Sequence, residues 1–235
     1  MKPKAVLFDM GGVLLKAAEK WDAEQFAISF PEGLPEPALT EWFLEMSGDI
    51  MNTFLSLKPP RPALDPIPFI KVWLWKRQVV PTQETTDLWF DTLCRWEPGP
   101  MYSWVPGAIR EVCQIGYRIG LVSNTVMPGK YVREKLQEAG ILDLFETTIF
   151  SAEVGINKPE PGIFHYALDA MRLSPDEAWY VGDKPQRDIC GAHRAGMRAV
   201  LVDSKHVNRI NDAPENTPDF RIEHVGYLPD LLKKI

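Results

Sequence analysis

The chain has 235 residues, of which 45% are hydrophobic and 25% charged, and this ordinary globular composition excludes a disordered or fibrous protein. With 26 Lys and Arg against 32 Asp and Glu, the net charge is −6, which argues against nucleic-acid binding and against binding to an anionic membrane surface. Three scattered cysteines without C-x-x-C spacing argue against a disulfide framework and suit a reducing cytoplasm. No apolar run is long enough for a signal peptide or a membrane span, so we expect a cytoplasmic protein.

Four short apolar runs predict buried parallel strands. In chain order they span residues 5–8, 119–122, 178–181 and 199–202. Helical patterns accompany the last three runs and span residues 107–115, 129–139, 161–171 and 186–195. This alternation predicts an α/β fold with a doubly wound parallel sheet.

The segment from residue 16 to 104 interrupts the alternation and has helical patterns of its own. Its expected helices span residues 21–30, 41–55, 69–79 and 82–96, and five prolines between residues 58 and 68 predict a loop there. Six of the eight tryptophans fall in this segment, and we expect them to form its own core, although a homodimer contact through them stays open. We therefore predict an α/β core of residues 1–15 and 105–235 with an inserted helical subdomain of residues 16–104.

Polar side chains follow the predicted strands at their carboxyl ends, where open α/β sheets bind ligands. Asp9 follows the first strand, Ser123 and Asn124 follow the second, and Asp183 follows the third. Lys158 lies in a loop 35 residues after Ser123 and 25 residues before Asp183, and each spacing fits one βαβ unit. The 114 residues from Asp9 to Ser123 exceed such a unit, and the helical insertion accounts for the excess. We expect these side chains to converge.

Three carboxylates, Asp9, Asp183 and Asp188, would share this site with Lys158 as a cation. Like charges oppose one another's ionisation unless a cation intervenes, and Mg²⁺ is the usual ion where a phosphate shares the site. The metal and Lys158 would neutralise phosphoryl oxygens. Asp9 is then placed to attack, forming an aspartyl-phosphate that water hydrolyses.

Four motifs resemble those of the haloacid dehalogenase (HAD) superfamily, in the order in which that family carries them. They are Phe8-Asp9-Met10-Gly11-Gly12-Val13, Leu121-Val122-Ser123-Asn124, residues 157–164 and residues 181–192, running on to Ala195-Gly196-Met197. The resemblance covers about residues 4–15 and 105–203 and implies a Rossmann-like core. The place of the insertion resembles the helical cap of the subclass whose cap follows the first motif.

The resemblance also implies roles for individual residues. Asp9 would be the nucleophile and a metal ligand, Gly11 would offer its backbone carbonyl to the metal, Asp183 would be the second carboxylate ligand, and Asp188 would bind or orient the metal's coordination shell. The implied catalytic set is Asp9, Ser123, Lys158 and Asp183. The implied phosphate-binding set is Gly11, Gly12, Ser123, Asn124 and Lys158.

One departure from the family pattern falls at Gly11, where phosphatases of this family usually carry a second Asp as general acid and base. Such help is typically worth ~10²–10⁴-fold in rate. A substrate with a good leaving group, a proton from the cap or from water, or a loss of catalysis would each accommodate Gly11. We expect the Gly11-Gly12 pair to serve a turn at positive φ.

The leading hypothesis is a Mg²⁺-dependent phosphatase that acts on a small phosphorylated metabolite. The alternatives are a 2-haloacid dehalogenase, whose relatives also lack the second Asp but need no metal, and a non-catalytic module that binds a phosphometabolite or a partner protein. A phosphonate hydrolase that uses a cap lysine is a minor variant, and a phosphomutase is disfavoured because it relies on the missing Asp. The sequence leaves the substrate open.

Overall fold

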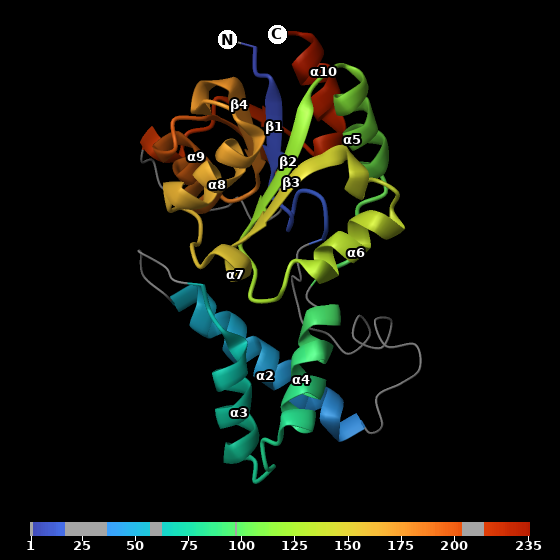
Figure 1. Cartoon of the computed structure of the whole chain (residues 1–235), viewed down its shortest axis with the longest axis vertical. Coiled ribbons are helices and arrows are strands. Elements are labelled where there is room, and N and C mark those ends of the chain that lie inside the picture. Colours follow the sequence, from blue (N-terminus) through green and yellow to red (C-terminus); the bar gives the residue numbers. More distant parts are fainter. Residues whose placement is uncertain (1, 17–36, 57–62, 97, 204–213) are drawn as a thin grey trace.

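The computed structural model describes residues 2–16, 37–56, 63–96, 98–203 and 214–235. One six-stranded parallel sheet forms its centre, in the order β3-β2-β1-β4-β5-β6 (Figure 1). The strands are β1 (Ala5–Phe8), β2 (Arg118–Ser123), β3 (Phe145–Phe150), β4 (Ala178–Gly182), β5 (Arg198–Val202) and β6 (Phe220–Ile222). The predicted α/β fold with a parallel sheet is confirmed.

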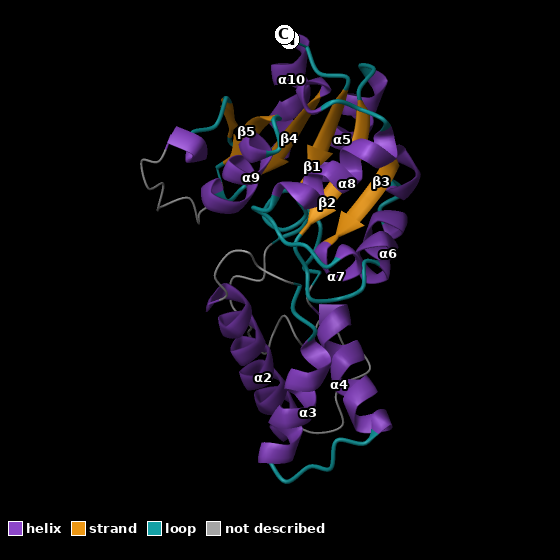
Figure 2. Cartoon of the chain, turned by 60° about the vertical axis from the view of Figure 1, so that its left-hand side comes forward, coloured by secondary structure: helices purple, strands orange, loops and turns teal. Residues whose placement is uncertain are grey.

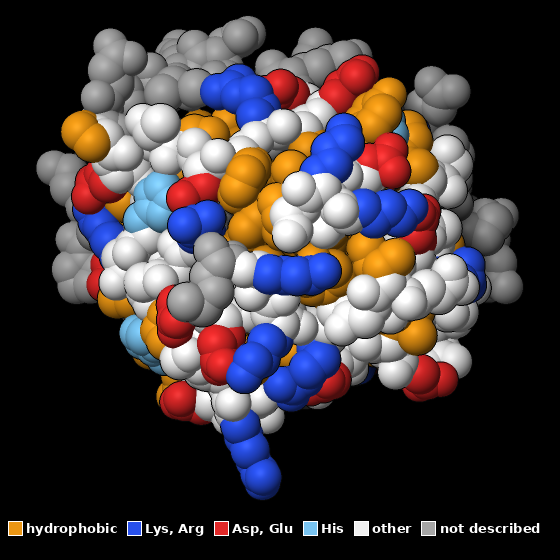
Figure 3. Space-filling view, turned by 90° about the horizontal axis from the view of Figure 1, so that it is seen from above, with side chains coloured by type: hydrophobic (Ala, Val, Ile, Leu, Met, Phe, Trp, Pro, Cys, Tyr) orange, Lys and Arg blue, Asp and Glu red, His pale blue; other side chains and the backbone are white. Residues whose placement is uncertain are grey.

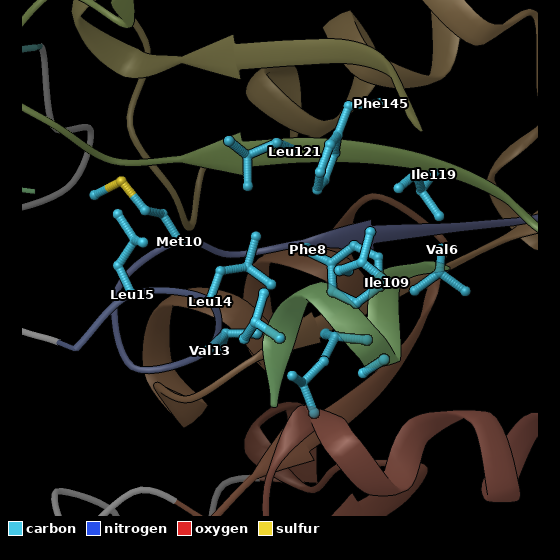
Figure 4. Packing of buried hydrophobic residues seen from close by; sticks show 14 of the residues in the cluster. Val6, Phe8, Met10, Val13, Leu14, Leu15, Ile109, Ile119, Leu121 and Phe145 are labelled. Atoms are coloured by element: carbon cyan, nitrogen blue, oxygen red, sulfur yellow. The ribbon is translucent and has the colours of Figure 1, made fainter. Parts of the chain in front are cut away.

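Burial on both faces explains why the central strands have unbroken apolar sequences. Val6 and Phe8 of β1 point into one core cluster and Ala5 and Leu7 into another on the opposite face. Figure 4 shows Val6 and Phe8 packed close to Ile109.

Helices cover both faces of the sheet. Helices α5 (Val105–Gln114), α6 (Lys130–Glu138) and α10 (Leu228–Lys233) pack on the face of Val6, and α8 (Pro161–Met171) and α9 (Cys190–Arg194) pack on the face of Leu7. The short helical elements are α7 (Ser151–Val154), the π-helical turn Pro185–Ile189, and the 3₁₀ turns Leu142–Leu144, Pro175–Glu177, Pro214–Asn216 and Val225–Tyr227. The helix predicted over residues 186–195 is thus divided into a π-helical turn and α9.

Three helices form a separate group beyond the carboxyl ends of the strands (Figures 1 and 2). They are α2 (Pro37–Ser56), α3 (Pro66–Lys76) and α4 (Gln83–Trp96). Trp73 and Trp89 are buried between them with ring centroids 5.3 Å apart. Val126 from the loop after β2 belongs to the same apolar cluster. These two tryptophans therefore serve as core side chains of the helical group, whereas Trp75 is 71% exposed.

The boundary of α3 corrects the predicted proline loop. The helix begins at Pro66 and contains Pro68, and the side chain of Asp65 caps it by accepting a hydrogen bond from the Ile67 N–H at 2.9 Å. Proline is tolerated in the first helical turn because the N–H groups there have no intrahelical partner. The helix predicted over residues 21–30 lies outside the described residues.

The surface at the end that holds both termini carries Lys and Arg side chains interspersed with Asp and Glu around a hydrophobic area (Figure 3). Among the described helices, none is both long and apolar enough to cross a membrane.

Candidate active site

Three buried carboxylates meet at the carboxyl ends of β1 and β4. Asp9 directly follows β1, and its N–H donates to the Val181 carbonyl at 2.8 Å. Asp183 directly follows β4, and Asp188 lies in the π-helical turn. One carboxylate oxygen from each of the three residues lies within 4.8 Å of the others, and the residues are only 4%, 0% and 0% exposed. The structure thus brings together the three acids that the sequence analysis singled out.

Lys158 is buried among these acids with only 1% of its surface exposed. Its ammonium lies 2.7 Å from Asp9 Oδ1 and 2.7 Å from Asp188 Oδ1, and it donates to the Tyr180 hydroxyl at 2.8 Å. That hydroxyl in turn donates to the Val122 carbonyl at 2.8 Å. Tyr180 therefore holds the lysine. Sequence analysis missed it, because its only signal is a ring with a polar end inside an apolar strand.

Ser123 ends β2 beside this group, and Asn124 directly follows it. Both polar side-chain atoms of Asn124 bond the backbone of Lys158, since Oδ1 accepts from its N–H at 2.8 Å and Nδ2 donates to its carbonyl at 3.1 Å. Asn124 therefore positions Lys158 in this structure, and a contact of its side chain with phosphate stays a prediction. Ser123 is 1% exposed, and among the described residues its hydroxyl makes only a long contact of 3.5 Å with the Asn124 carbonyl, so it retains the capacity to donate.

The two glycines after Asp9 meet different constraints. Gly12 has φ +80°, and a Cβ there would lie 2.3 Å from Asp183 Oδ2. A Cβ at Gly11 would meet nothing within 4 Å, and Gly11 does not have a positive φ. The expected backbone reason for the glycine pair is therefore correct for Gly12 and wrong for Gly11. No steric constraint from the described residues explains the glycine at position 11.

The loop from Asp183 to Asp188 is closed by its own side chains. Asp188 Oδ2 accepts from the N–H groups of Asp183 at 3.1 Å and Lys184 at 2.9 Å. The Lys184 ammonium lies 2.6 Å from Asp183 Oδ2. Lys184 is a second cation at the site that sequence analysis did not single out, although it directly follows a predicted metal ligand.

The buried acids differ in the direction of their pKa shifts. Burial raises the pKa of Asp9 to about 6, with Lys158 opposing the rise and the other two acids adding to it. Burial alone would also raise the pKa of Asp188, but the charges of Lys158 and Arg187, together with hydrogen bonds from Lys158 and the Lys184 N–H, outweigh it and lower the pKa. A further cation at the site would favour the ionised form of Asp9.

The arrangement fits a divalent metal ion. Asp183 Oδ1 is buried and has no hydrogen-bond partner among the described residues. Leaving a buried acceptor without a partner costs free energy, and a bound cation removes that cost. Hard ions such as Mg²⁺ take carboxylate oxygens as ligands, and three such oxygens lie together here.

Comparison with known proteins finds a matching family model and curated relatives for part of the chain. Residues 100–202, which carry Ser123, Lys158 and Asp183, match the family model described as haloacid dehalogenase-like hydrolase. The chain is 40% identical over 123 residues to the phosphoserine phosphatase of Thermus thermophilus, an alignment that covers 52% of this chain and 47% of that protein. It is 42% identical over 119 residues to the glyceraldehyde 3-phosphate phosphatase of Methanothermobacter thermautotrophicus, covering 50% and 52%. The chain thus spans about half the length of these curated relatives.

Solved structures match over nearly the whole chain. A HAD phosphatase from Thermococcus onnurineus is 25% identical with a TM-score of 0.59, covering 99% of this chain and 98% of that one. A 2-haloacid dehalogenase from Pseudomonas syringae pv. Tomato has a TM-score of 0.72 and covers 99% of both chains, but at 22% identity this likeness concerns the fold alone. The family match, the relatives and the fold show that the chain is similar to members of the haloacid dehalogenase superfamily, as the motifs predicted.

Proposed function

We propose that this protein is a Mg²⁺-dependent phosphatase that hydrolyses a small phosphorylated metabolite through an aspartyl-phosphate on Asp9. The observation that carries the proposal is the buried cluster of Asp9, Asp183 and Asp188 around Lys158. The phosphatases among the relatives support the same reaction class. The resemblance implies that the dehalogenases lack one of the two acids that correspond to Asp183 and Asp188, so the three acids favour phosphate chemistry over halide displacement.

In this proposal Asp9, Asp183, Asp188 and the backbone carbonyl of Gly11 would hold the metal ion. When bound, Mg²⁺ would neutralise charge on the phosphoryl oxygens and orient the group for attack. Lys158, fixed by its buried contacts, would bind the same oxygens from the protein side. The Ser123 hydroxyl would donate a hydrogen bond to them, and Gly12 would let the backbone approach closely.

The reaction would proceed in two displacements on phosphorus. A carboxylate oxygen of Asp9 attacks, the P–O bond to the leaving group breaks, and an aspartyl-phosphate forms. Water then attacks this phosphorus, so inorganic phosphate leaves and the Asp9 carboxylate is restored. Because Gly11 offers no carboxyl group, the leaving oxygen would receive its proton from a cap residue or from water, or depart as a stable anion.

We further propose that residues 16–104 act as a cap on a core of residues 1–15 and 105–235. Helices α2–α4 lie beyond the strand ends that carry the site (Figure 2). Val126 packs among these helices, and the Tyr131 hydroxyl donates to Asp91 of α4 at 2.8 Å, so α6 and α4 are linked. A cap in this place would exclude water from the aspartyl-phosphate and supply contacts to the rest of the substrate.

The experiment that tests the function measures phosphate release from sugar, nucleotide and acyl phosphates by the purified full chain, with Mg²⁺ and with EDTA. We expect metal-dependent release from at least one compound, lost in Asp9→Asn. Asp169→Asn is the matched control because Asp169 is exposed on α8, away from the site. If no compound releases phosphate but the protein still binds one of them, the non-catalytic module is favoured. Halide release from a 2-haloacid that persists with EDTA would favour the dehalogenase.

A further inference from the structure

Lys184 is a cation that the proposed reaction does not use, yet it is paired with a proposed metal ligand. Its ammonium lies 2.6 Å from Asp183 Oδ2. Asp183 is fully buried, whereas the side chain of Lys184 is 27% exposed. The other oxygen of the carboxylate, Oδ1, lacks a hydrogen-bond partner among the described residues. One oxygen of Asp183 is therefore neutralised by the protein and the other is available.

The backbone on which Lys184 sits is fixed by the loop itself. The Lys184 N–H donates to Asp188 Oδ2 at 2.9 Å, which fixes the backbone from which the lysine extends. On the other side, Gly12 leaves room for Asp183 Oδ2, which a Cβ at that position would approach to 2.3 Å. Asp183 Oδ2 is thus held between a glycine and an ammonium group.

Lys158 and Lys184 differ in how far their side chains are exposed to solvent. Lys158 is 1% exposed and surrounded by oxygen atoms of Asp9, Asp188 and Tyr180. Lys184 reaches solvent, so its ammonium can exchange Asp183 for water. A divalent ion on Asp183 either meets the like charge of Lys184 at close range or requires that lysine to turn outward. Both responses weaken metal binding.

We propose that Lys184 is a resident counter-ion of Asp183 that competes with Mg²⁺ for this carboxylate and lowers the metal affinity of the protein. The inference rests on the proposed function, because it takes Asp183 as a metal ligand. It assigns Lys184 a positioning role: the lysine acts through Asp183 and touches no reacting atom.

The test is the dissociation constant of Mg²⁺, measured by calorimetric titration of the full chain without substrate. We expect Lys184→Gln to bind Mg²⁺ about tenfold more tightly, since a unit charge near the ion is removed. Lys184→Arg keeps the charge and should retain the weak affinity. Lys233→Gln is the matched control, because Lys233 also forms an ion pair, with Glu111 at 2.6 Å, but on helices α10 and α5. It should leave the affinity within about twofold of the wild type.

Asp183→Asn separates a failure of this inference from a failure of the proposed function. If Asp183→Asn abolishes Mg²⁺ binding while Lys184→Gln binds as the wild type does, or more weakly, the counter-ion role is overturned and the metal site stands. If Asp183→Asn leaves Mg²⁺ binding unchanged, the proposed metal site and the inference both fall. Tighter binding in Lys184→Gln alone, among the three lysine variants, is the result that supports the inference.

Discussion

Gly11 and Gly12 are neighbours in the loop after β1, but the structure makes different demands on them. Gly12 combines a positive φ with a close approach to Asp183. Gly11 has neither, and the space where its Cβ would lie is open. A Cβ at position 11 would therefore be accommodated without disturbing the carboxylates. The glycine there removes a proton donor from the proposed reaction without a requirement of the fold.

Gly11→Asp is expected to restore general acid catalysis. An alkyl phosphate needs a proton on its leaving oxygen, so we predict that kcat for such a substrate rises, by up to about 10²-fold. An aryl phosphate whose leaving group departs as a stable anion should change little. The measurement is kcat for both compounds with Gly11→Asn as control, because an amide fills the same space without being an acid. An equal gain in both variants would contradict the argument.

Gly12→Ala is expected to destabilise the folded protein. The left-handed backbone disfavours any residue with a Cβ, and the new methyl group would collide with Asp183, so we predict a loss of about 2 kcal/mol or more in the free energy of unfolding. Urea denaturation measures this loss. Gly11→Ala is the matched control, and it should be neutral or slightly stabilising because it restricts only the unfolded chain. Equal destabilisation by the two substitutions would refute the distinction between the glycines.

At the scale of secondary-structure elements, β1 and β4 are joined at their amino ends by Lys4 and Glu177. The Lys4 N–H donates to the Glu177 carbonyl at 2.7 Å, and the Lys4 ammonium pairs with the Glu177 carboxylate. That carboxylate also accepts from the Ser174 N–H at 3.0 Å. Hydrogen bonds from Lys4 and Ser174 lower the pKa of Glu177 to about 2. The ionised carboxylate is therefore favoured in the folded state.

This pair predicts a pH-dependent contribution to stability. Because the folded pKa lies below the unfolded value of 4.5, the contribution is present above that value and is lost as the pH falls toward about 2. Glu177→Gln should therefore lower stability at neutral pH, with a smaller difference from the wild type at a pH of about 3. Urea denaturation at both pH values measures the difference. If the difference in the free energy of unfolding between the wild type and Glu177→Gln were the same at both pH values, the predicted pH dependence would be contradicted.

The strands that the sequence predicted are those buried on both faces of the sheet. Strands β1, β2, β4 and β5 coincide with the four apolar runs. The strands β3 and β6 were missed because they lie at the edges of the sheet, where β3 carries partly exposed Glu and Thr residues and β6 has only three residues. The start of α3 was missed because prolines in a first helical turn look like a loop in the sequence.

The site was predictable as far as residue type and topology determine it. Asp9 and Asp183 converge because the parallel strands β1 and β4 end on the same side of the sheet, and Lys158 reaches them from the loop before α8. Tyr180 and Lys184 were not predicted, since their roles depend on the direction of a side chain within a strand and a loop. The open space at Gly11 likewise follows only from the surrounding packing.

At the scale of the whole molecule, the acids lie at the carboxyl ends of the strands, and this is the end of the sheet nearest the helical group (Figures 1 and 2). Helices α2–α4 have an apolar core of their own, which includes Trp73 and Trp89. Val126 from the core region packs into it. A separate core allows side chains on the helices to vary without disturbing the acids. This arrangement supports the proposal that the residues at the strand ends carry out the chemistry and the helices select the substrate.

The central claim is that Asp9 becomes phosphorylated during turnover. The most direct measurement is peptide mass spectrometry. The full chain is mixed with Mg²⁺ and a substrate that it hydrolyses, and the reaction is quenched rapidly with acid. We expect a phosphoryl group on the peptide that contains Asp9, absent with EDTA and absent in Asp9→Asn. Steady phosphate release without modification of that peptide, or release that persists in Asp9→Asn, would contradict it.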